Sequence, residues 1–255
     1  MRIASELSIV TLKMENELRT TATGIVQQLQ KAGFDAFWVG GSVRDFLLGR
    51  EPDDYDIVTS ALPEQIENIF KNTIAVGRKF GVIVVIEKEH QFQVATFRAE
   101  ADYKDGRHPE HVRFGDARAD AERRDFTVNG LFFDPVREQL HDWVGGEKDL
   151  KARIIRTIGM PNERFAEDHL RLLRAARLAA RLNFEIEPET FRAVQANAAK
   201  IKLISAERIR DELIKLFAPS SLGPLASRGL VLLRDSGLLE HVLPEVAATI
   251  HCEQS

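Results

Sequence analysis

Asp54 and Asp56, two aspartates separated by one residue, are the residues of this sequence best suited to metal chemistry. They stand in the run DYDIV, whose β-branched residues predict a strand over residues 55–59. Because side chains alternate along a strand, both carboxylates would lie on one face, about 7 Å apart, with Tyr55 on the other. Carboxylate oxygens at that spacing can share one or two hard cations such as Mg²⁺. An isolated pair after Pro52 fits a solvated loop better, so a second feature is needed.

A glycine turn shortly before the aspartates predicts a place for a phosphate group. Gly40 and Gly41 follow the apolar run AFWV, which predicts a strand. Ser42 then stands where a helix N-cap belongs, with Asp45 as its acidic capping partner. The N–H groups at a helix start favour an anion, glycines let a phosphate approach closely, and Arg44 would add a forked donor. The pattern is neither a P-loop nor a dinucleotide-binding motif, and a plain chain reversal is the alternative.

The elements that must position these residues change in character near residue 150. Before it, short β-branched or aromatic runs alternate with turn signals, so a strand-helix-strand path would bring the phosphate site beside the two acids. After it the apolar spacing is helical. Together the phosphate site and the metal pair suggest nucleotidyl transfer. The predicted strands are 36–39, 55–59, 81–88, 92–98 and 139–143, and the predicted helices are 42–49, 62–70, 167–182, 187–200, 205–217 and 225–242.

Composition limits the class of protein. A chain of 255 residues, 44% hydrophobic and 29% charged, can form one large domain or two smaller ones with real cores. The formal net charge of -4 does not exclude a nucleic-acid partner, which needs only a local basic face, and arginines concentrate at 117–125 and 171–181. The sequence has no run of roughly 20 apolar residues and no apolar segment typical of a signal peptide near its start. These features predict a cytoplasmic protein with no membrane partner.

Cysteine and histidine usage limits the kind of metal site. The one cysteine, Cys252, allows no internal disulfide and no cysteine-rich zinc site. The histidines show no ligand spacing, which is typical of surface or capping groups. A metal bound by this chain is therefore expected to have oxygen ligands.

Several segments, in one order between residues 25 and 217, resemble a known family. They are GGSVRDFLLGREPDDYDIVTS (40–60), RRDFTVNGLFFDP (123–135), the segment 142–146, RFAEDHLRLLRAARLAARL (164–182) and SAERIRDELIKLF (205–217). These are similar to the first signature, the second signature, the hinge, the nucleotide-selecting helix and the last neck motif of class II tRNA nucleotidyltransferases, the CCA-adding enzymes. The bacterial poly(A) polymerases share these motifs, and both groups belong to the DNA polymerase β nucleotidyltransferase superfamily.

The resemblance implies an α+β fold with a definite domain order. An N-terminal helix or extension at 1–24 would precede a nucleotidyltransferase head at 25–150, in which helices flank a mixed β-sheet. An all-helical neck at 151–218 would follow, and then 219–255 as the start of a helical body that is truncated relative to the family. Whether that short end is natural is left open.

The resemblance also implies the reaction and its residues. Asp54 and Asp56 would bind two Mg²⁺ ions for transfer of CMP or AMP from CTP or ATP to the 3′-hydroxyl of tRNA or another RNA. The residues implied to contact the nucleotide are Gly40, Gly41, Ser42, Arg44, Arg124, Asp125, Asn129, Asp168, Arg171, Arg174 and Arg177.

The spacing of Asp168, Arg171 and Arg174 supports a way to choose the base. At about 100° per residue the three fall within one arc of a predicted helix, while leucines and alanines occupy another. Cytosine and adenine present an amino donor beside a ring-nitrogen acceptor, whereas uracil and guanine present a carbonyl beside an N–H. A carboxylate next to a guanidinium would accept from the amino group and donate to the ring nitrogen. A solvated arginine-rich face is the alternative.

Two features affect the choice among functions. Many relatives carry an acid where this chain has Gln93, and a neutral amide is a poorer Mg²⁺ ligand. The segment 98–114 resembles the loop that helps to switch from C to A addition, which disfavours a CC-only enzyme. Three hypotheses remain: a CCA-adding enzyme, a poly(A) polymerase of the same family, and a catalytically weak RNA-binding or regulatory module, the last suggested by Gln93 and the short C-terminus.

Overall fold

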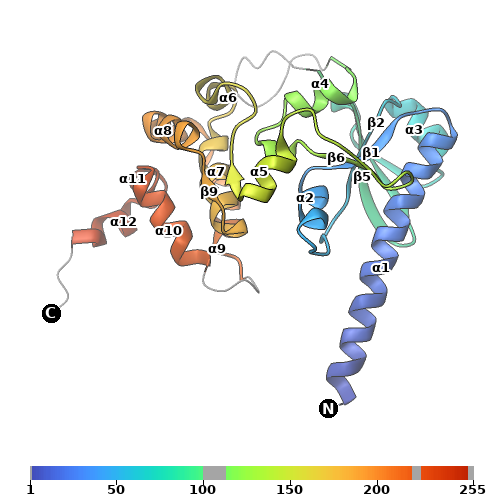
Figure 1. The fold of residues 1–255 in the computed structure, drawn as a ribbon, viewed down its shortest axis with the longest axis horizontal. Helices are drawn as coiled ribbons and strands as arrows, with labels where there is room; N and C mark the ends of the chain where they lie inside the picture. Colours follow the sequence, from blue (N-terminus) through green and yellow to red (C-terminus); the bar gives the residue numbers. More distant parts are fainter. Residues whose placement is uncertain (1, 100–112, 220–224, 252–255) are drawn as a thin grey trace. The chain divides into compact units, whose positions relative to one another are not determined.

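The computed structural model of the protein describes residues 2–99, 113–219 and 225–251, with side chains from residue 17 to residue 250. These residues form two compact units (Figure 1). The first comprises 2–99, 113–124 and 128–146, and the second comprises 125–127, 147–219 and 225–251.

The first unit is built on a seven-stranded mixed sheet with the strand order β3-β4-β5-β2-β1-β6-β7. The pairing of β2 with β5 is parallel, and all other pairings in the sheet are antiparallel. This confirms the expected α+β fold with a mixed sheet flanked by helices. The strands are β1 (Ala36–Val39), β2 (Asp56–Thr59), β3 (Thr73–Gly77), β4 (Val82–Glu87), β5 (His90–Thr96), β6 (Phe132–Asp134) and β7 (Gln139–His141).

Helices account for most of the remaining described residues. The α-helices are α1 (Arg2–Lys31), α2 (Gly41–Leu47), α3 (Pro63–Ile69), α4 (Ala117–Glu122), α5 (Gly146–Ala152), α6 (Pro161–Glu167), α7 (Leu170–Leu182), α8 (Pro188–Asn197), α9 (Ala206–Phe217), α10 (Leu225–Asp235), α11 (Leu239–Val242) and α12 (Pro244–Ala247). Short 3₁₀ segments are η1 (Arg78–Phe80), η2 (Thr127–Asn129), η3 (Ala198–Leu203) and η4 (Ala248–His251). No helix in these ranges is both long and apolar enough to cross a membrane.

Both faces of the sheet carry apolar residues. Helix α1, blue in Figure 1, contacts β1 and α3, and its residues Ile25, Val26 and Leu29 are fully buried. The helix that was expected within 1–24 therefore continues to Lys31. A second cluster, which includes Val39 of β1 and Ala121 of α4, buries residues from the sheet and from α4. This cluster fixes α4, and with it the arginines that follow, against the sheet.

The edge strand β3 ends the sheet on one side and is irregular. Its pairing with β4 shifts register between Ile74 and Gly77, which marks a bulge. Val76, within that bulge, is 78% exposed, and Arg78 and Lys79 follow the strand directly. The run at 73–77 was not predicted as a strand, and in the structure its residues do not alternate between buried and exposed.

The second unit packs its helices around α7, whose leucines and alanines are buried and whose arginines are partly exposed. Helices α9 and α10 both contact α7. The segment after residue 150 was expected to be all helical, but β8 (Ile154–Ile155) and β9 (Glu185–Ile186) pair as a small parallel sheet. Two residues per strand are too few to show a strand period in the sequence.

The predicted helix at 167–182 is interrupted. Helix α6 ends at Glu167 and α7 begins at Leu170, because Asp168 is extended, with φ -151° and ψ 106°. The predicted helix at 225–242 also divides into α10 and α11, at Gly237 with φ 75°. In both places a helical apolar spacing continues through a turn, so the pattern alone does not show the break.

Candidate active site

Gly40 sets the turn between β1 and α2. Its φ of 73° and ψ of -132° suit glycine and strain other residues. The prediction that Ser42 caps the helix is wrong, because Gly40 is the N-cap and the cap has no side-chain hydrogen bond. Ser42 is buried and its hydroxyl donates to the Val39 carbonyl at 2.9 Å, while Asp45 pairs with Arg44. The serine thus ties the turn to the strand.

The two candidate metal ligands lie at the start of β2. Asp54 is exposed and precedes the strand, Asp56 is its partly buried first residue, and Tyr55 between them is buried. Burial raises the pKa of the Asp56 carboxyl, the negative charge of Asp54 raises it further, and Arg124 opposes this rise. The two carboxylates are therefore close enough to repel each other, which is the arrangement that a cation relieves.

Tyr55 anchors this pair from the opposite side. Its ring lies 4.6 Å from that of Trp38, centroid to centroid, and its hydroxyl donates to Glu51 at 3.0 Å. Burial and the neighbouring Glu51 raise the pKa of the Tyr55 phenol, so the phenol stays protonated as a donor. The alternation that was predicted for the three residues 54 to 56 is consistent with this burial pattern.

Gln93 lies beside Asp56. In the parallel pairing of β2 with β5, Ile57 is opposite Val94, so one step back along both strands brings Asp56 next to Gln93 on the same face. Gln93 is exposed. Within the described ranges no group of three or more His, Cys, Asp or Glu side chains could hold a metal ion. The oxygen-bearing side chains that the structure places together here are two carboxylates and a neighbouring amide.

Asp120, which the sequence analysis did not single out, holds Arg124 beside these acids. It has no solvent exposure, and its Oδ2 accepts from Nε and Nη2 of Arg124 at 3.1 and 2.8 Å. Burial raises the Asp120 pKa, but Arg124 and Arg123 more than reverse this, so the pKa is lowered. A Cβ atom on Gly40 would lie 3.4 Å from Nη1 of Arg124. The i, i+3, i+4 spacing of an acid and two arginines in DAERR was the available signal.

Arg44 is fixed by two neighbours. Its Nη1 donates to Asn129 Oδ1 at 2.7 Å, and its Nε and Nη2 donate to Asp45 at 3.0 and 2.8 Å. A Cβ atom on Gly41 would lie 3.5 Å from Nη2 of Arg44. In the first unit the structure thus brings together the predicted residues Gly40, Gly41, Arg44, Asp54, Asp56, Arg124 and Asn129 around the end of β1 and the start of β2.

In the second unit, Asp125 binds Arg174 of α7. Both Nε and Nη2 of Arg174 donate to Oδ2 of Asp125, with Nε at 2.8 Å. The charge of Asp125 is the main cause of a raised pKa for Arg174; burial opposes it, and Glu212 and Asp168 add to it. The predicted residues Asp125, Asp168 and Arg174 therefore belong to one charged group.

Asp168 and Arg171 do not pair with each other. Asp168 lies outside α7, so the arc drawn on a single helix was wrong for this residue. Its Oδ1 accepts from Leu170 N at 3.0 Å, and its Oδ2 accepts from Arg208 Nη2 at 2.7 Å. Arg171 donates instead to Glu167 and to the carbonyl of Arg164. Carboxylate and guanidinium are near in sequence, but each has another partner.

Arg177 is held by Glu212 of α9. Its Nε donates to Glu212 Oε2 at 2.5 Å, and Glu212 is 4% exposed. Burial lowers the pKa of Arg177, and Glu212 opposes this. The sequence analysis missed Glu212 and Arg208, because their partners are far away in the chain. Their position in the last neck motif was the only signal.

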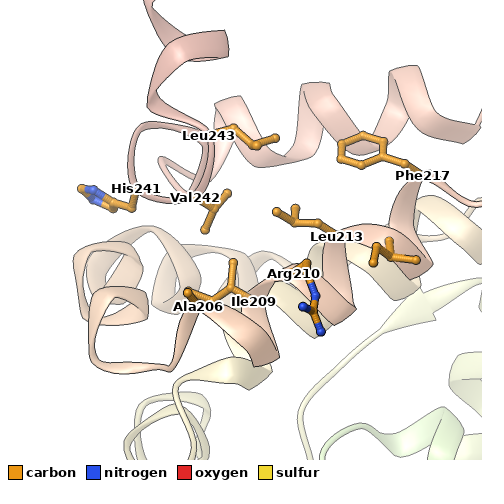
Figure 2. A pocket seen from close by; sticks show the side chains of 9 residues that line it. Ala206, Ile209, Arg210, Leu213, Phe217, His241, Val242 and Leu243 are labelled. Carbon is orange, nitrogen blue, oxygen red and sulfur yellow. The ribbon is translucent and has the colours of Figure 1, made fainter.

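The opposite side of α9 lines an apolar groove with α11 (Figure 2). Its volume is about 490 Å³, and Ile209, Leu213 and Val242 are among its lining residues. Arg210 also lines this groove, and it pairs with the exposed Asp211. Arg208 and Arg210 thus contact different groups although they are two residues apart.

The mixed sheet with two neighbouring acids and adjoining arginines defines a nucleotidyltransferase head. Residues 36–156 match the family model described as the poly A polymerase head domain. Residues 183–250 match the model described as a probable RNA and SrmB-binding site of polymerase A. The chain belongs to the nucleotidyltransferase family of the CCA-adding enzymes and poly(A) polymerases.

Individual relatives agree with this assignment. The chain is 47% identical over 204 residues to a CCA-adding enzyme of Staphylococcus aureus (strain MRSA252). The aligned residues make up 80% of this chain and 51% of that protein. The structure is similar to that of the Bacillus stearothermophilus CCA-adding enzyme in complex with CTP, with a TM-score of 0.77 and 43% sequence identity. This match covers 85% of the present chain and 52% of that one. A tRNA nucleotidyltransferase complexed with a primer tRNA and an incoming ATP analog gives a TM-score of 0.71 and 29% sequence identity, over 86% of the present chain and 62% of that one. The chain spans about half the length of the curated relatives it matches.

Proposed function

We propose that the protein is a template-independent nucleotidyltransferase that adds CMP and AMP, from CTP and ATP, to tRNA 3′ ends. One observation carries this proposal: Asp54 and Asp56 lie close together beside Arg124, at the strand start that follows the Gly40 turn. Relatives that match most of the chain are named CCA-adding enzymes, and this favours CCA addition over poly(A) synthesis.

Asp54 and Asp56 would hold Mg²⁺. Their oxygens are the hard ligands that this ion prefers. Burial, and after it the negative charge of Asp54, raises the pKa of the Asp56 carboxyl, and a bound cation would offset both. When bound, Mg²⁺ favours the ionised RNA 3′-hydroxyl and stabilises charge on the attacked phosphate and on pyrophosphate. The neutral Gln93 beside Asp56 would be a weaker ligand for Mg²⁺ than an acid at that position.

Arg44 and Arg124 would bind the triphosphate. Both guanidinium groups are oriented by carboxylates, Arg44 by Asp45 and Arg124 by Asp120, so their direction is set before a ligand arrives. Oriented donors stabilise charge that develops in the transition state without reorganising at that moment. Gly40 and Gly41 leave room for phosphate oxygens near these two arginines.

Asp168, with Arg171 and Arg174, would recognise the base. The carboxylate accepts from the exocyclic amino group of cytosine or adenine, and a guanidinium donates to the ring nitrogen. The two arginines would exchange part of their present pairing for the base. Asp125 would act by holding Arg174, to which it is bound, and Arg177 by adding positive charge next to Glu212, which also pairs with Arg174. A cytoplasmic location stays a prediction from the sequence.

The test is a gel assay of the purified chain with Mg²⁺ and three labelled acceptors: tRNA lacking its CCA end, tRNA ending in CC, and an unrelated short RNA. We expect three additions to the first acceptor that require both CTP and ATP and then stop. Asp54→Ala and Asp56→Ala should abolish extension, and Asp53→Ala, a change at the neighbouring exposed acid, should not.

Two outcomes would contradict the proposal. A long ladder with ATP alone on any RNA would indicate a poly(A) polymerase. If the wild type extends no acceptor beyond the level of the Asp54→Ala and Asp56→Ala variants, even at high RNA concentration, the remaining hypothesis is a catalytically weak RNA-binding module.

A further inference from the structure

Arg208 of α9 forms an ion pair with Asp168, from Nη2 to Oδ2 at 2.7 Å, across 40 residues of sequence. We infer that Arg208 is a specificity-determining positioning residue, which holds the Asp168 carboxylate in the orientation that accepts from the amino group of cytosine or adenine. This inference rests on the proposed function, because it assigns to α9 a part in the choice of nucleotide.

Two hydrogen bonds fix the plane of the carboxylate. Leu170 N donates to Oδ1 at 3.0 Å, and Arg208 donates to Oδ2. Each carboxylate oxygen can accept two hydrogen bonds, so one direction on each stays open for a ligand. The terminal torsion of an aspartate is broad, and a single backbone bond leaves rotation of the group about it. The second contact removes that rotation.

The other arginines near Asp168 are directed elsewhere. Arg171 donates to Glu167 and to the Arg164 carbonyl, and Arg174 donates to Asp125. Arg208 is therefore the guanidinium that sets the orientation of Asp168, although it lies in a different helix and was not among the predicted nucleotide contacts.

The pair contributes little to folding but much to geometry. Its side chains are 26% and 22% exposed, and partly exposed pairs stabilise folded proteins only weakly. Discrimination between bases depends on whether the Asp168 carboxylate presents an acceptor oxygen to the base edge or has rotated away from it. Loss of Arg208 should therefore change nucleotide preference more than stability.

The test compares Arg208→Gln, which removes the charge, with Arg208→Lys, which keeps it. The contact uses one nitrogen, so lysine can replace it in part. Arg210→Gln is the matched control, since Arg210 lies in the same helix, has a side chain that is 63% exposed, and pairs with Asp211 rather than with Asp168. Dissociation constants for CTP, ATP, UTP and GTP are measured with Mg²⁺ in the absence of RNA, followed by single-nucleotide incorporation.

We expect Arg208→Gln to reduce the preference for CTP over UTP by about tenfold, the factor that corresponds to about 1.4 kcal/mol. Arg208→Lys should recover most of the preference, and Arg210→Gln should keep it. The melting temperature of Arg208→Gln should stay within about 4 °C of the wild type, because the pair is partly exposed. In the background Asp168→Asn, the change Arg208→Gln should have no further effect on preference, since it acts through Asp168.

Distinct results overturn the inference and the proposed function. If the wild type prefers CTP and ATP and Arg208→Gln keeps that preference, only the inference is wrong. An equal loss for all four nucleotides, or full additivity with Asp168→Asn, would also overturn it. A wild type without any preference for CTP and ATP would overturn both.

Discussion

The guanidinium of Arg124 is bound through two nitrogens to one carboxylate oxygen of Asp120, a side chain with no solvent exposure. The other oxygen of Asp120 accepts from Arg123 and from the backbone of Arg98. A buried acid thus determines where the arginine beside Asp54 and Asp56 can point.

Replacing Asp120 should reduce both stability and catalysis. Asp120→Asn removes the charge while keeping the shape, and we expect it to lower the free energy of unfolding by about 2 kcal/mol. The KM for CTP should rise, because Arg124 loses its direction. Urea unfolding and steady-state kinetics check this, with Glu122→Gln, half of an exposed pair with Arg118, as the control. An unchanged KM would show that Arg124 does not need Asp120 for binding.

The pH dependence of Mg²⁺ binding should report Asp56. Its pKa is raised in the folded protein, so protons compete with the metal at a higher pH than for an ordinary aspartate with a pKa of about 3.9. As the pH falls, the Mg²⁺ concentration for half-maximal activity should rise, and this rise should begin earlier than such an aspartate would give. Asp54→Asn removes one cause of the raised pKa, so direct Mg²⁺ titration of this variant should show proton competition at lower pH. The same competition curve in both proteins would contradict this explanation.

The pKa of Asp120 is shifted in the opposite direction to that of Asp56, and this shift makes the stability of the protein depend on pH. Because its folded pKa is lowered, its contribution is fully present above the unfolded pKa and is lost as the pH falls through the folded value. Acid unfolding of the wild type should therefore be steeper than that of Asp120→Asn. Parallel curves of unfolding free energy against pH would argue against a charged Asp120.

Gln93→Glu should strengthen Mg²⁺ binding. The change places a third carboxylate beside Asp56, and we expect the half-saturating Mg²⁺ concentration to fall by about tenfold, equivalent to about 1.4 kcal/mol. Gln91→Glu is a matched control, because Gln91 is an exposed residue two positions away on the same strand. If both variants lower the requirement equally, the effect is general electrostatic attraction.

Tyr55 should position the catalytic pair through its ring more than through its hydroxyl. Tyr55→Phe loses the hydrogen bond to Glu51 and should cost about 1 kcal/mol of stability with little change in Mg²⁺ requirement. Tyr55→Ala loses the contact with Trp38 and should cost about 3–5 kcal/mol. Equal Mg²⁺ requirements in both folded variants would remove the positioning role.

Local order in the sequence was enough to predict part of the site. Asp54, Asp56 and Arg44 lie within one strand-helix-strand segment, and the local pattern placed Asp56 in a strand, now β2, with Asp54 directly before it, and Arg44 in a helix, now α2. Ser42 was misplaced by the same kind of local rule, because a glycine with positive φ can begin a helix without a side-chain cap.

Long-range pairing could not be predicted in the same way. The partner of Asp168 is 40 residues away and that of Arg174 is 49 residues away, and one sequence does not tell which charges meet. The break before α7 has the same origin. The apolar spacing continues through Asp168, whose carboxylate accepts from Leu170 N at the start of α7 and from Arg208, 40 residues away.

The irregular edge strand β3 has a consequence for solubility. A flat, unpaired strand with exposed apolar residues is a template for edge-to-edge aggregation. The bulge between Ile74 and Gly77 interrupts the hydrogen-bond ladder next to the exposed Val76. Arg78 and Lys79 add positive charge directly after the strand. Another chain that approached this edge would meet mismatched hydrogen-bond spacing and electrostatic repulsion. The bulge and these charges are features that disfavour pairing of a sheet edge with another chain.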